Sequence, residues 1–160
     1  MILGFTGTSK GMTQRQAATV HYLFGELKLT VLHHGDCVGA DAQADRIVRR
    51  MGGILIVIHP PSDEKVRSFC NGVPPHAVRE EKPYLARNRD IVAEGVDGLI
   101  AAPKDFVQPK SLRGQGTWTT VGYARKAGRR IWIVFPDGTF KEEHCDEGRT
   151  AREAQGPPVA

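Results

Sequence analysis

The sequence predicts an α/β fold, an open three-layer sandwich in which helices cover both faces of a mostly parallel β-sheet. Two observations predict it: short apolar runs recur along the chain, and segments with the periodicity of amphipathic helices alternate with them. Strands that are apolar throughout need cover on both faces, and parallel strands need helical crossovers. Right-handed crossovers then favour the strand order 3-2-1-4-5, with the switch point between the first and fourth strands.

Three strands and two helices are expected in the first part of the chain. Thr13 and Gln16 form a capping box at the start of the first helix, in which apolar residues then share one face. A glycine-containing turn leads into the second helix, which is expected to stop at Gly52 and Gly53 because glycine commonly follows a helix end. The expected strands are residues 1–8, 30–34 and 54–59.

The second part adds two helices and two strands and contains one unusually long connection. The polar segment from 62 to 83 exceeds ordinary connections, so it is expected to cover the ligand crevice as a lid or to form a contact in a homo-oligomer. The helices are expected near 85–94 and 117–126, and the strands at 96–102 and 130–135.

Length and composition indicate one soluble domain. We expect a single domain over residues 1–138 and a mobile tail over 139–160, which is rich in charge and ends in Gly-Pro-Pro-Val-Ala. No apolar run approaches the ~20 residues of a membrane span, and a first strand at the N-terminus leaves no room for a signal peptide. The cysteines are odd in number and lack a zinc or redox motif, which indicates reduced thiols in a cytoplasmic protein.

The residues best suited to binding a ligand are expected at the carboxyl ends of the strands, where open α/β sheets bind their ligands. Glycines let the backbone approach an anion, a helix start offers free N–H groups, and arginines add charge, so the pattern predicts a phosphate site. The amide of Asn88 suits a ribose or a base edge. The expected nucleotide-binding residues are Gly7, Thr8, Ser9, Lys10, Gly35, Asp36, Gly39, Ala40, Asp41, Arg87, Asn88, Arg89, Pro103, Gly114, Gly116 and Thr117.

Some of these residues have a second interpretation. Ser9 stands before Lys10 where a Walker P-loop needs glycine, so that motif is rejected. The carboxylates of Asp36 and Asp41 either accept hydrogen bonds from a ribose or cap free N–H groups near a helix start. A metal shared by these two carboxylates is disfavoured, and no metal and no cofactor are expected.

The histidines, Trp118 and the cysteines are weaker candidates. Neighbouring residues on a strand point to opposite faces, so His33 and His34 are not expected to bind one ion, and His34 is expected to be hydrogen-bonded within the structure. Trp118, beside the glycine motif, either stacks on a base or packs in the core. Cys37 and Cys70 lack the histidine and aspartate pattern that supports a nucleophile.

Taken together, these motifs resemble the SLOG superfamily, which joins the DNA-processing protein A family and the Lonely-Guy phosphoribohydrolases, and they are most similar to its small YspA-like branch. The resemblance covers roughly residues 2–136. It implies a Rossmann-like fold and a ligand such as a nucleoside monophosphate, ADP-ribose or an NAD-related nucleotide. The motifs that carry it are Gly7-Thr8, the turn from Gly35 to Asp41, Arg87-Asn88-Arg89, and Gly116-Thr117.

The chain departs from the phosphoribohydrolase pattern at a residue that supports hydrolysis. Those enzymes carry a glutamate three residues after the glycine-threonine pair, where this chain has Thr120, and Leu112 and Arg113 stand in place of part of their glycine-rich lead-in. Without that carboxylate, an oxocarbenium-like ribosyl centre loses its counter-charge. The carboxylates that remain as replacements are Asp41, Asp90 and Glu94.

We therefore expect the protein to bind or sense a small nucleotide ligand, with no membrane partner. The first alternative is an N-glycosidase or phosphoribohydrolase that acts on a nucleotide. The second is binding of single-stranded nucleic acid of the DNA-processing type, because Lys104, Lys110 and Arg113 place positive charge in one loop. The formal net charge of +4 agrees with any of these anionic partners and does not choose between them.

Overall fold

The computed structural model describes residues 1–70, 76–144 and 152–154 of the chain. The helices are α1 (Gln14–Glu26), α2 (Ala40–Met51), α3 (Tyr84–Ala93) and α4 (Gly116–Lys126), with a short 3-10 helix at Glu64–Val66. The strands are β1 (Ile2–Gly7), β2 (Val31–His34), β3 (Leu55–Ile58), β4 (His76–Val78), β5 (Gly98–Ala102), β6 (Arg130–Val134), β7 (Phe140–Glu143) and β8 (Arg152–Ala154). Every helix and strand expected from the sequence is present, close to its expected bounds.

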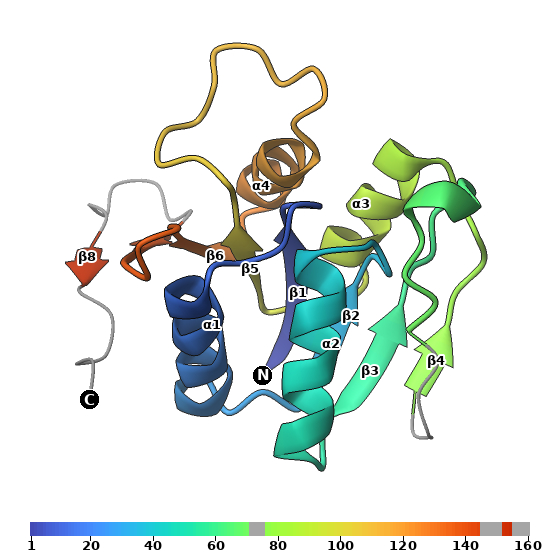
Figure 1. Cartoon of the computed structure of the whole chain (residues 1–160), viewed down its shortest axis with the longest axis horizontal. Helices are drawn as coiled ribbons and strands as arrows, with labels where there is room; N and C mark the ends of the chain where they lie inside the picture. The colour runs from blue at the N-terminus through green and yellow to red at the C-terminus, as the bar shows by residue number, and fades with distance from the viewer. Residues whose placement is uncertain (71–75, 145–151, 155–160) are drawn as a thin grey trace.

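The strands form one sheet with the order β4-β3-β2-β1-β5-β6-β7, and the short β8 follows β7 (Figure 1). Neighbouring strands are parallel from β4 to β6, whereas β7 and β8 are antiparallel. The central order β3-β2-β1-β5-β6 confirms the predicted order 3-2-1-4-5 and the α/β class. The switch point lies between β1 and β5, where Gly7 is in register with Ala102.

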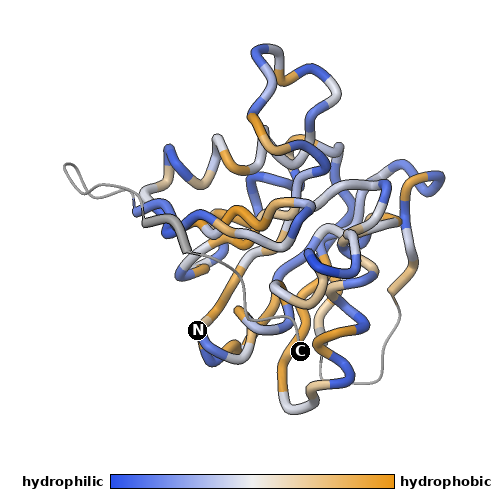
Figure 2. Tube along the Cα trace, turned by 60° about the vertical axis from the view of Figure 1, so that its left-hand side comes forward, coloured by the Kyte–Doolittle hydropathy of each residue, from blue (hydrophilic) through white to orange (hydrophobic). Residues whose placement is uncertain are grey.

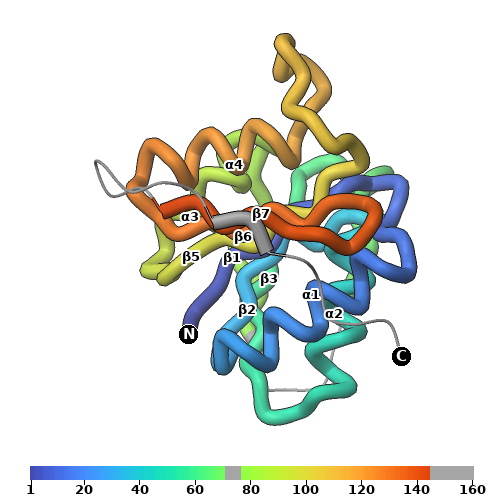
Figure 3. The backbone as a smooth tube through the Cα atoms, turned by 90° about the vertical axis from the view of Figure 1, so that its left-hand side faces the viewer, coloured from blue at the N-terminus to red at the C-terminus, as the bar shows by residue number. Residues whose placement is uncertain are grey.

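Helices cover both faces of the sheet, with α1 and α2 on one face and α3 and α4 on the other (Figure 3). Phe24 of α1 packs edge-on against Phe5 of β1 on the first face. On the second face, Trp118 of α4 belongs to a buried cluster with Leu99 of β5. Hydrophobic residues accordingly run along the central strands (Figure 2). Burial of these two apolar layers is the main force that holds the sandwich together.

The predicted capping box is confirmed and also ties α1 to the carboxyl edge of the sheet. The Thr13 hydroxyl accepts from the Gln16 backbone N–H at 3.1 Å, and the Gln16 side-chain oxygen accepts from the Thr13 N–H at 3.3 Å. The buried Gln16 amide then donates to the carbonyls of Pro103 and Val134, both at 2.8 Å. One side chain therefore joins the helix start to the ends of β5 and β6.

The boundary expected at residue 138 needs correction, because the chain returns to the sheet as β7. Phe140 is in register with Val134 in an antiparallel pair, so residues 140–143 are part of the domain and not of a tail. The charges that suggested a tail are paired: Arg125 of α4 holds Glu143 by two hydrogen bonds of 2.8 and 3.0 Å. The rest of the expected tail lies largely outside the described residues.

The long connection from 62 to 83 contains structure that the sequence did not reveal. Its 3-10 helix lies beside the Asp36 turn, where Val38 N–H donates to the Val66 carbonyl at 3.0 Å. Strand β4 then adds a parallel edge strand next to β3. Its predicted mobility stays a prediction, and residues 71–75 lie outside the described part. Among the described helices, none combines the length and the apolar character needed to cross a bilayer.

Candidate functional site

A hollow of about 280 Å³ opens at the carboxyl ends of β1 and β5, the switch point of the sheet. This is where ligands bind in open α/β sheets. The first turn, the end of β5 and the start of α4 meet there, although they lie far apart in the sequence. The predicted residues that line the hollow are Gly7, Thr8, Ser9, Lys10, Pro103, Gly114, Gly116 and Thr117.

The turn after β1 is held by the groups of Thr8. Its N–H donates to the Ala102 carbonyl at 3.0 Å, which continues the pairing with β5. Its hydroxyl accepts from the Lys10 N–H at 3.1 Å, and its carbonyl accepts from Gly11 and Ala40, at 3.1 and 3.0 Å. Thr8 itself is buried, while Ser9 and Lys10 are exposed at the hollow. The turn is therefore rigid where it meets the core and polar where it meets solvent.

The start of α4 forms the opposite wall. Gln115 occupies the N-cap position without a capping hydrogen bond from its side chain. The threonine hydroxyls in the first turns of the helix donate to carbonyl groups instead. Thr119 donates to the Gln115 carbonyl at 3.0 Å, and Thr120 donates to the Gly116 carbonyl at 2.9 Å. Within the described part of the chain, the N-cap side chain thus leaves the first N–H groups of this helix uncapped, and the helix dipole adds a partial positive charge to them. An uncapped helix start beside a hollow suits an anion.

Tyr84 divides the crevice into two chambers. An added Cβ at Gly116 would lie 2.0 Å from the Tyr84 hydroxyl oxygen, so the phenol packs directly against the start of α4. A second hollow of about 710 Å³ lies beside the first and shares Tyr84, Val66 and the Gly114–Gly116 backbone with it. Leu85, Leu112 and Arg113 contribute to its wall. The two chambers together can hold a ligand larger than a phosphate group.

Asp36 and Asp41 shape the floor of the crevice by holding backbone turns. The Asp41 carboxylate accepts from Gly35 and Cys37 N–H groups at 3.1 and 3.2 Å. The Asp36 carboxylate accepts from Arg67 Nε at 2.7 Å and from the Cys70 N–H at 2.8 Å. Both side chains are buried, and neither lines the hollow. The expectation that one of these carboxylates accepts a hydrogen bond from a ribose is therefore not supported. Their hydrogen bonds instead support the alternative, in which they cap backbone N–H groups of turns.

Arg87 lies beneath the crevice rather than inside it. Its guanidinium is 3.9 Å from the Asp41 carboxylate, donates to the Cys37 sulfur at 3.1 Å and stacks on the Tyr84 ring. Only 2% of Arg87 is exposed. An added Cβ at Gly35 would lie 1.3 Å from the guanidinium, so the glycine leaves the space that Arg87 fills. Gly35, Asp41 and Arg87 thus form a buried unit that supports the site.

The expectation that Arg89 reaches the crevice is wrong. Residues two apart on an α-helix point about 200° apart, so Arg87 and Arg89 cannot face the same side. Arg89 is exposed and stacks over the Tyr123 ring at 5.0 Å, beside a separate shallow hollow between α3 and α4. Asn88 is buried, and its amide nitrogen has no hydrogen-bond partner among the described residues.

Burial keeps the two described cysteines protonated. Desolvation, reinforced by the neighbouring Asp41, raises the pKa of Cys37 to about 11 even though Arg87 acts against it. Desolvation likewise raises the pKa of Cys70 to about 12. Neither thiol is a thiolate near neutral pH, and nucleophilic chemistry requires the thiolate.

His34 and Trp118 have structural positions. His34 Nε2 lies 3.0 Å from the Asp45 carboxylate, and its Nδ1 accepts from the Asp36 N–H at 3.1 Å. This confirms the expected hydrogen-bonded histidine. Trp118 packs in the core with Val121 and lines the hollow at one edge. Its indole N–H is buried and has no partner among the described residues.

Sequence reasoning missed Tyr84 and Val66, which both border the two chambers. A signal existed for Tyr84, because it precedes Arg87 by three residues and so shares its face of α3. Val66 carries no such signal, since its place depends on how the 62–83 connection folds back over the crevice. Gly39 and Ala40 do not line the hollow but support the first turn from below, where Ala40 N–H donates to Thr8.

Comparison with known proteins identifies the fold. No family model and no curated protein sequence matches the chain. The structural genomics target TM1055 matches with 16% identity and a TM-score of 0.59, over 82% of this chain and 72% of that one. DNA processing protein A from Streptococcus pneumoniae matches with 18% identity and a TM-score of 0.57, over 82% of this chain and 49% of that one.

A third structure is DNA processing protein A from Helicobacter pylori, described for its single-stranded DNA binding mode. It matches with 17% identity and a TM-score of 0.52, over 83% of this chain and 64% of that one. The chain therefore spans about half to two thirds of the length of these two DNA processing proteins. Their fold is the one that the SLOG resemblance implied, and that implication is confirmed. The assignment to the YspA-like branch stays a prediction.

Proposed function

We propose that the protein binds a nucleotide or a nucleotide-derived ligand, with a phosphate group in the smaller chamber. The observation that carries the proposal is the uncapped start of α4, which opens onto the hollow opposite the polar turn at Ser9 and Lys10. Backbone N–H groups at a helix start and a lysine on the facing wall are together a common way to bind a phosphate. Lys104, also on the wall, adds a second positive charge.

The larger chamber supports a ligand with more than a phosphate. Its wall offers apolar groups from Leu85 and Leu112 together with the Arg113 side chain. Such a mixture suits a base or a nucleoside, whose faces are apolar and whose edges are polar. Since both chambers share the Gly114–Gly116 backbone, one ligand can reach from one to the other.

Binding or sensing is favoured over N-glycosidic hydrolysis because the candidate carboxylates are committed elsewhere. The position of the phosphoribohydrolase glutamate is held by Thr120, which is fully buried and bonded within α4. Asp41 holds the floor of the crevice, Asp90 binds Lys82 at 2.6 Å, and Glu94 binds Arg79 at 2.9 Å. None of these three lines either chamber, and the carboxylates that do are Asp105 in the smaller chamber and Asp63 in the larger.

Single-stranded nucleic acid is the second candidate ligand. One observation favours it: Lys104, Lys110 and Arg113 are all exposed in the loop between β5 and α4, which borders the crevice. A backbone with several phosphates gains from each of these charges, and its binding weakens steeply with salt. A mononucleotide in the smaller chamber depends much less on salt.

Replacing Gly116 with alanine is expected to weaken nucleotide binding by about 10-fold or more, the range for losing a hydrogen bond to a charged group. The new Cβ must displace Tyr84 and also crowds the N–H groups at the start of α4. Calorimetry with nucleoside monophosphates and ADP-ribose, chosen by a thermal-shift screen, measures the change.

The matched control is Gly122→Ala in the same helix. A Cβ at Gly122 meets nothing within 4 Å, so this change should leave ligand affinity intact and stabilise the helix by about 0.5–1 kcal/mol. Equal nucleotide affinity in folded Gly116→Ala and Gly122→Ala proteins would show that the start of α4 is not part of the nucleotide site. Release of free base from a bound nucleotide would instead favour the hydrolase, and steeply salt-dependent oligonucleotide binding would favour the nucleic-acid candidate.

A further inference from the structure

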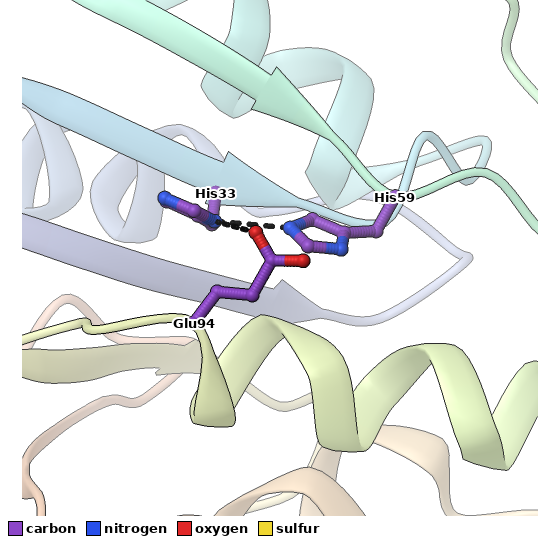
Figure 4. A group of neighbouring side chains, drawn as sticks. All are labelled: His33, His59 and Glu94. Carbon is purple, nitrogen blue, oxygen red and sulfur yellow. Dashed lines mark hydrogen bonds and ion pairs between the residues drawn. The ribbon is translucent and has the colours of Figure 1, made fainter. Parts of the chain in front are cut away.

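Two histidines and a glutamate converge on the face of the sheet that α3 covers, apart from the crevice (Figure 4). His33 lies in β2, His59 directly follows β3, and Glu94 is the C-cap residue of α3. His33 Nδ1 lies 3.0 Å from His59 Nε2 and 4.0 Å from a Glu94 carboxylate oxygen. All three ligand atoms lie within 4.8 Å of one another.

We propose that His33, His59 and Glu94 form a binding site for a divalent transition metal ion of the zinc type. Zinc sites that keep one open position use three protein ligands, and two histidines with one glutamate are a known set. Imidazole nitrogens about 2.0–2.1 Å from a tetrahedral zinc are roughly 3.3 Å apart, so the two rings need to separate by only a few tenths of an ångström. This inference does not depend on the proposed nucleotide function.

The remaining adjustment falls on the most exposed of the three side chains. Glu94 must approach the imidazoles by about 1 Å, a shift within the reach of a side chain with three rotatable bonds. Its side chain is 34% exposed, so a water molecule has access to the fourth position. The two histidines are buried and already face each other, which spares the binding step the cost of ordering them.

The electrostatic surroundings are consistent with this site. Burial lowers the pKa of His33 and brings that of His59 to about 3, so both rings are neutral, the form that binds metal. Glu94 and Asp90 from α3 act in the opposite direction, whereas His34 and Arg79 add to the lowering. Among the described residues, Arg79 competes for this carboxylate, since its Nε holds Glu94 at 2.9 Å, but its side chain is 46% exposed and solvent can take the place of Glu94 around it.

Zinc titration of the whole protein by calorimetry tests the site. We expect one zinc ion per chain and a higher melting temperature in zinc than in chelator. Cobalt in place of zinc should give the visible bands of a tetrahedral ion without a charge-transfer band from a thiolate, which separates this site from any zinc bound by cysteines. No saturable binding, or a thiolate band, overturns the proposal.

Two variants, Glu94→Gln and Arg79→Gln, both break the ion pair between Glu94 and Arg79, but only Glu94→Gln removes a proposed zinc ligand. Glu94→Gln removes the carboxylate and should lower zinc affinity by about 10-fold or more. Loss of a group that only supports a metal ligand already lowers metal affinity by about 10-fold to 100-fold, and loss of a ligand should cost at least as much. Arg79→Gln removes the competing cation and should leave zinc affinity equal or higher. His21→Asn, at an exposed histidine, controls for surface binding. Equal zinc affinity in the Glu94→Gln and Arg79→Gln proteins overturns the assignment of Glu94 and with it the proposal.

Discussion

Replacing Gly39 with alanine is expected to be among the most destabilising single changes in this protein. Gly39 is the N-cap residue of α2, with φ 91° and ψ −124°, a conformation that is strained for a residue with a side chain. An added Cβ would also lie 2.5 Å from the Ser9 carbonyl oxygen and 2.6 Å from that of Thr8. These are backbone atoms of the first turn, so no side-chain rotation relieves the contact.

The expected loss is about 2–6 kcal/mol in the free energy of unfolding, with backbone strain and overpacking each contributing about 1–3 kcal/mol. Gly52→Ala at the other end of α2 is the matched control. Gly52 also has positive φ, at 72°, but a Cβ there meets nothing within 4 Å. Urea unfolding of both variants therefore separates the steric cost from the strain. A Gly39→Ala protein as stable as Gly52→Ala would show that the first turn can move away from α2.

Arg87→Met is expected to destabilise the folded protein by about 3 kcal/mol, the lower end of the range for breaking a buried ion pair. The lower end applies because the guanidinium is 3.9 Å from the Asp41 carboxylate and not hydrogen-bonded to it. Arg89→Met in the same helix removes an exposed arginine that stacks on Tyr123, worth about 0.5–1 kcal/mol. Urea unfolding should thus show a clearly lower free energy of unfolding for Arg87→Met than for Arg89→Met. Equal stabilities would contradict a stabilising role for Arg87 in the buried unit.

The same variant should show a distinctive pH dependence. Burial already raises the pKa of Asp41, although His34 and Arg87 act against it, so loss of Arg87 raises it further. A carboxyl whose folded pKa exceeds its unfolded value binds its proton more tightly when folded, and the folded state gains stability as pH falls. The deficit of Arg87→Met should therefore be largest above the folded pKa of Asp41 and shrink as pH falls through it. Adding Asp41→Asn should reduce the deficit at neutral pH and flatten this dependence.

The order of the central strands could be predicted because it follows from local patterns and a general rule of handedness. Apolar residues dominate the central strands except β2, which reads Val-Leu-His-His, and each amphipathic segment between two strands strongly favours a right-handed crossover. The strands outside this central set, β4, β7 and β8, escaped prediction for the opposite reason. β7 reads Phe-Lys-Glu-Glu, and the role of its charges became clear only from their partners in the structure, such as Arg125 on α4. A strand near the edge of a sheet needs little apolar surface, so its composition resembles that of a loop.

The main-chain part of the crevice was also visible in the sequence, since glycine-containing turns follow β1 and precede α4, and the switch-point rule brings them together. The side-chain part was not. Arg87 and Arg89 look equivalent along the chain, and only the packing of α3 on the sheet sends one beneath the crevice and the other to Tyr123. Asp36 and Asp41 likewise proved to be bonded within the fold.

The sequence by itself determined the α/β class and the order of the five central strands, and it predicted the place where we propose that a ligand binds, because these depend on periodicity, handedness and backbone conformation. Only the tertiary structure decided which charged side chains face that place and which partners His33 meets. His33 pairs with His59 and Glu94 because β2, β3 and the end of α3 come together in space. Contacts between residues so far apart in the chain depend on the packed geometry of whole elements, which no local pattern encodes.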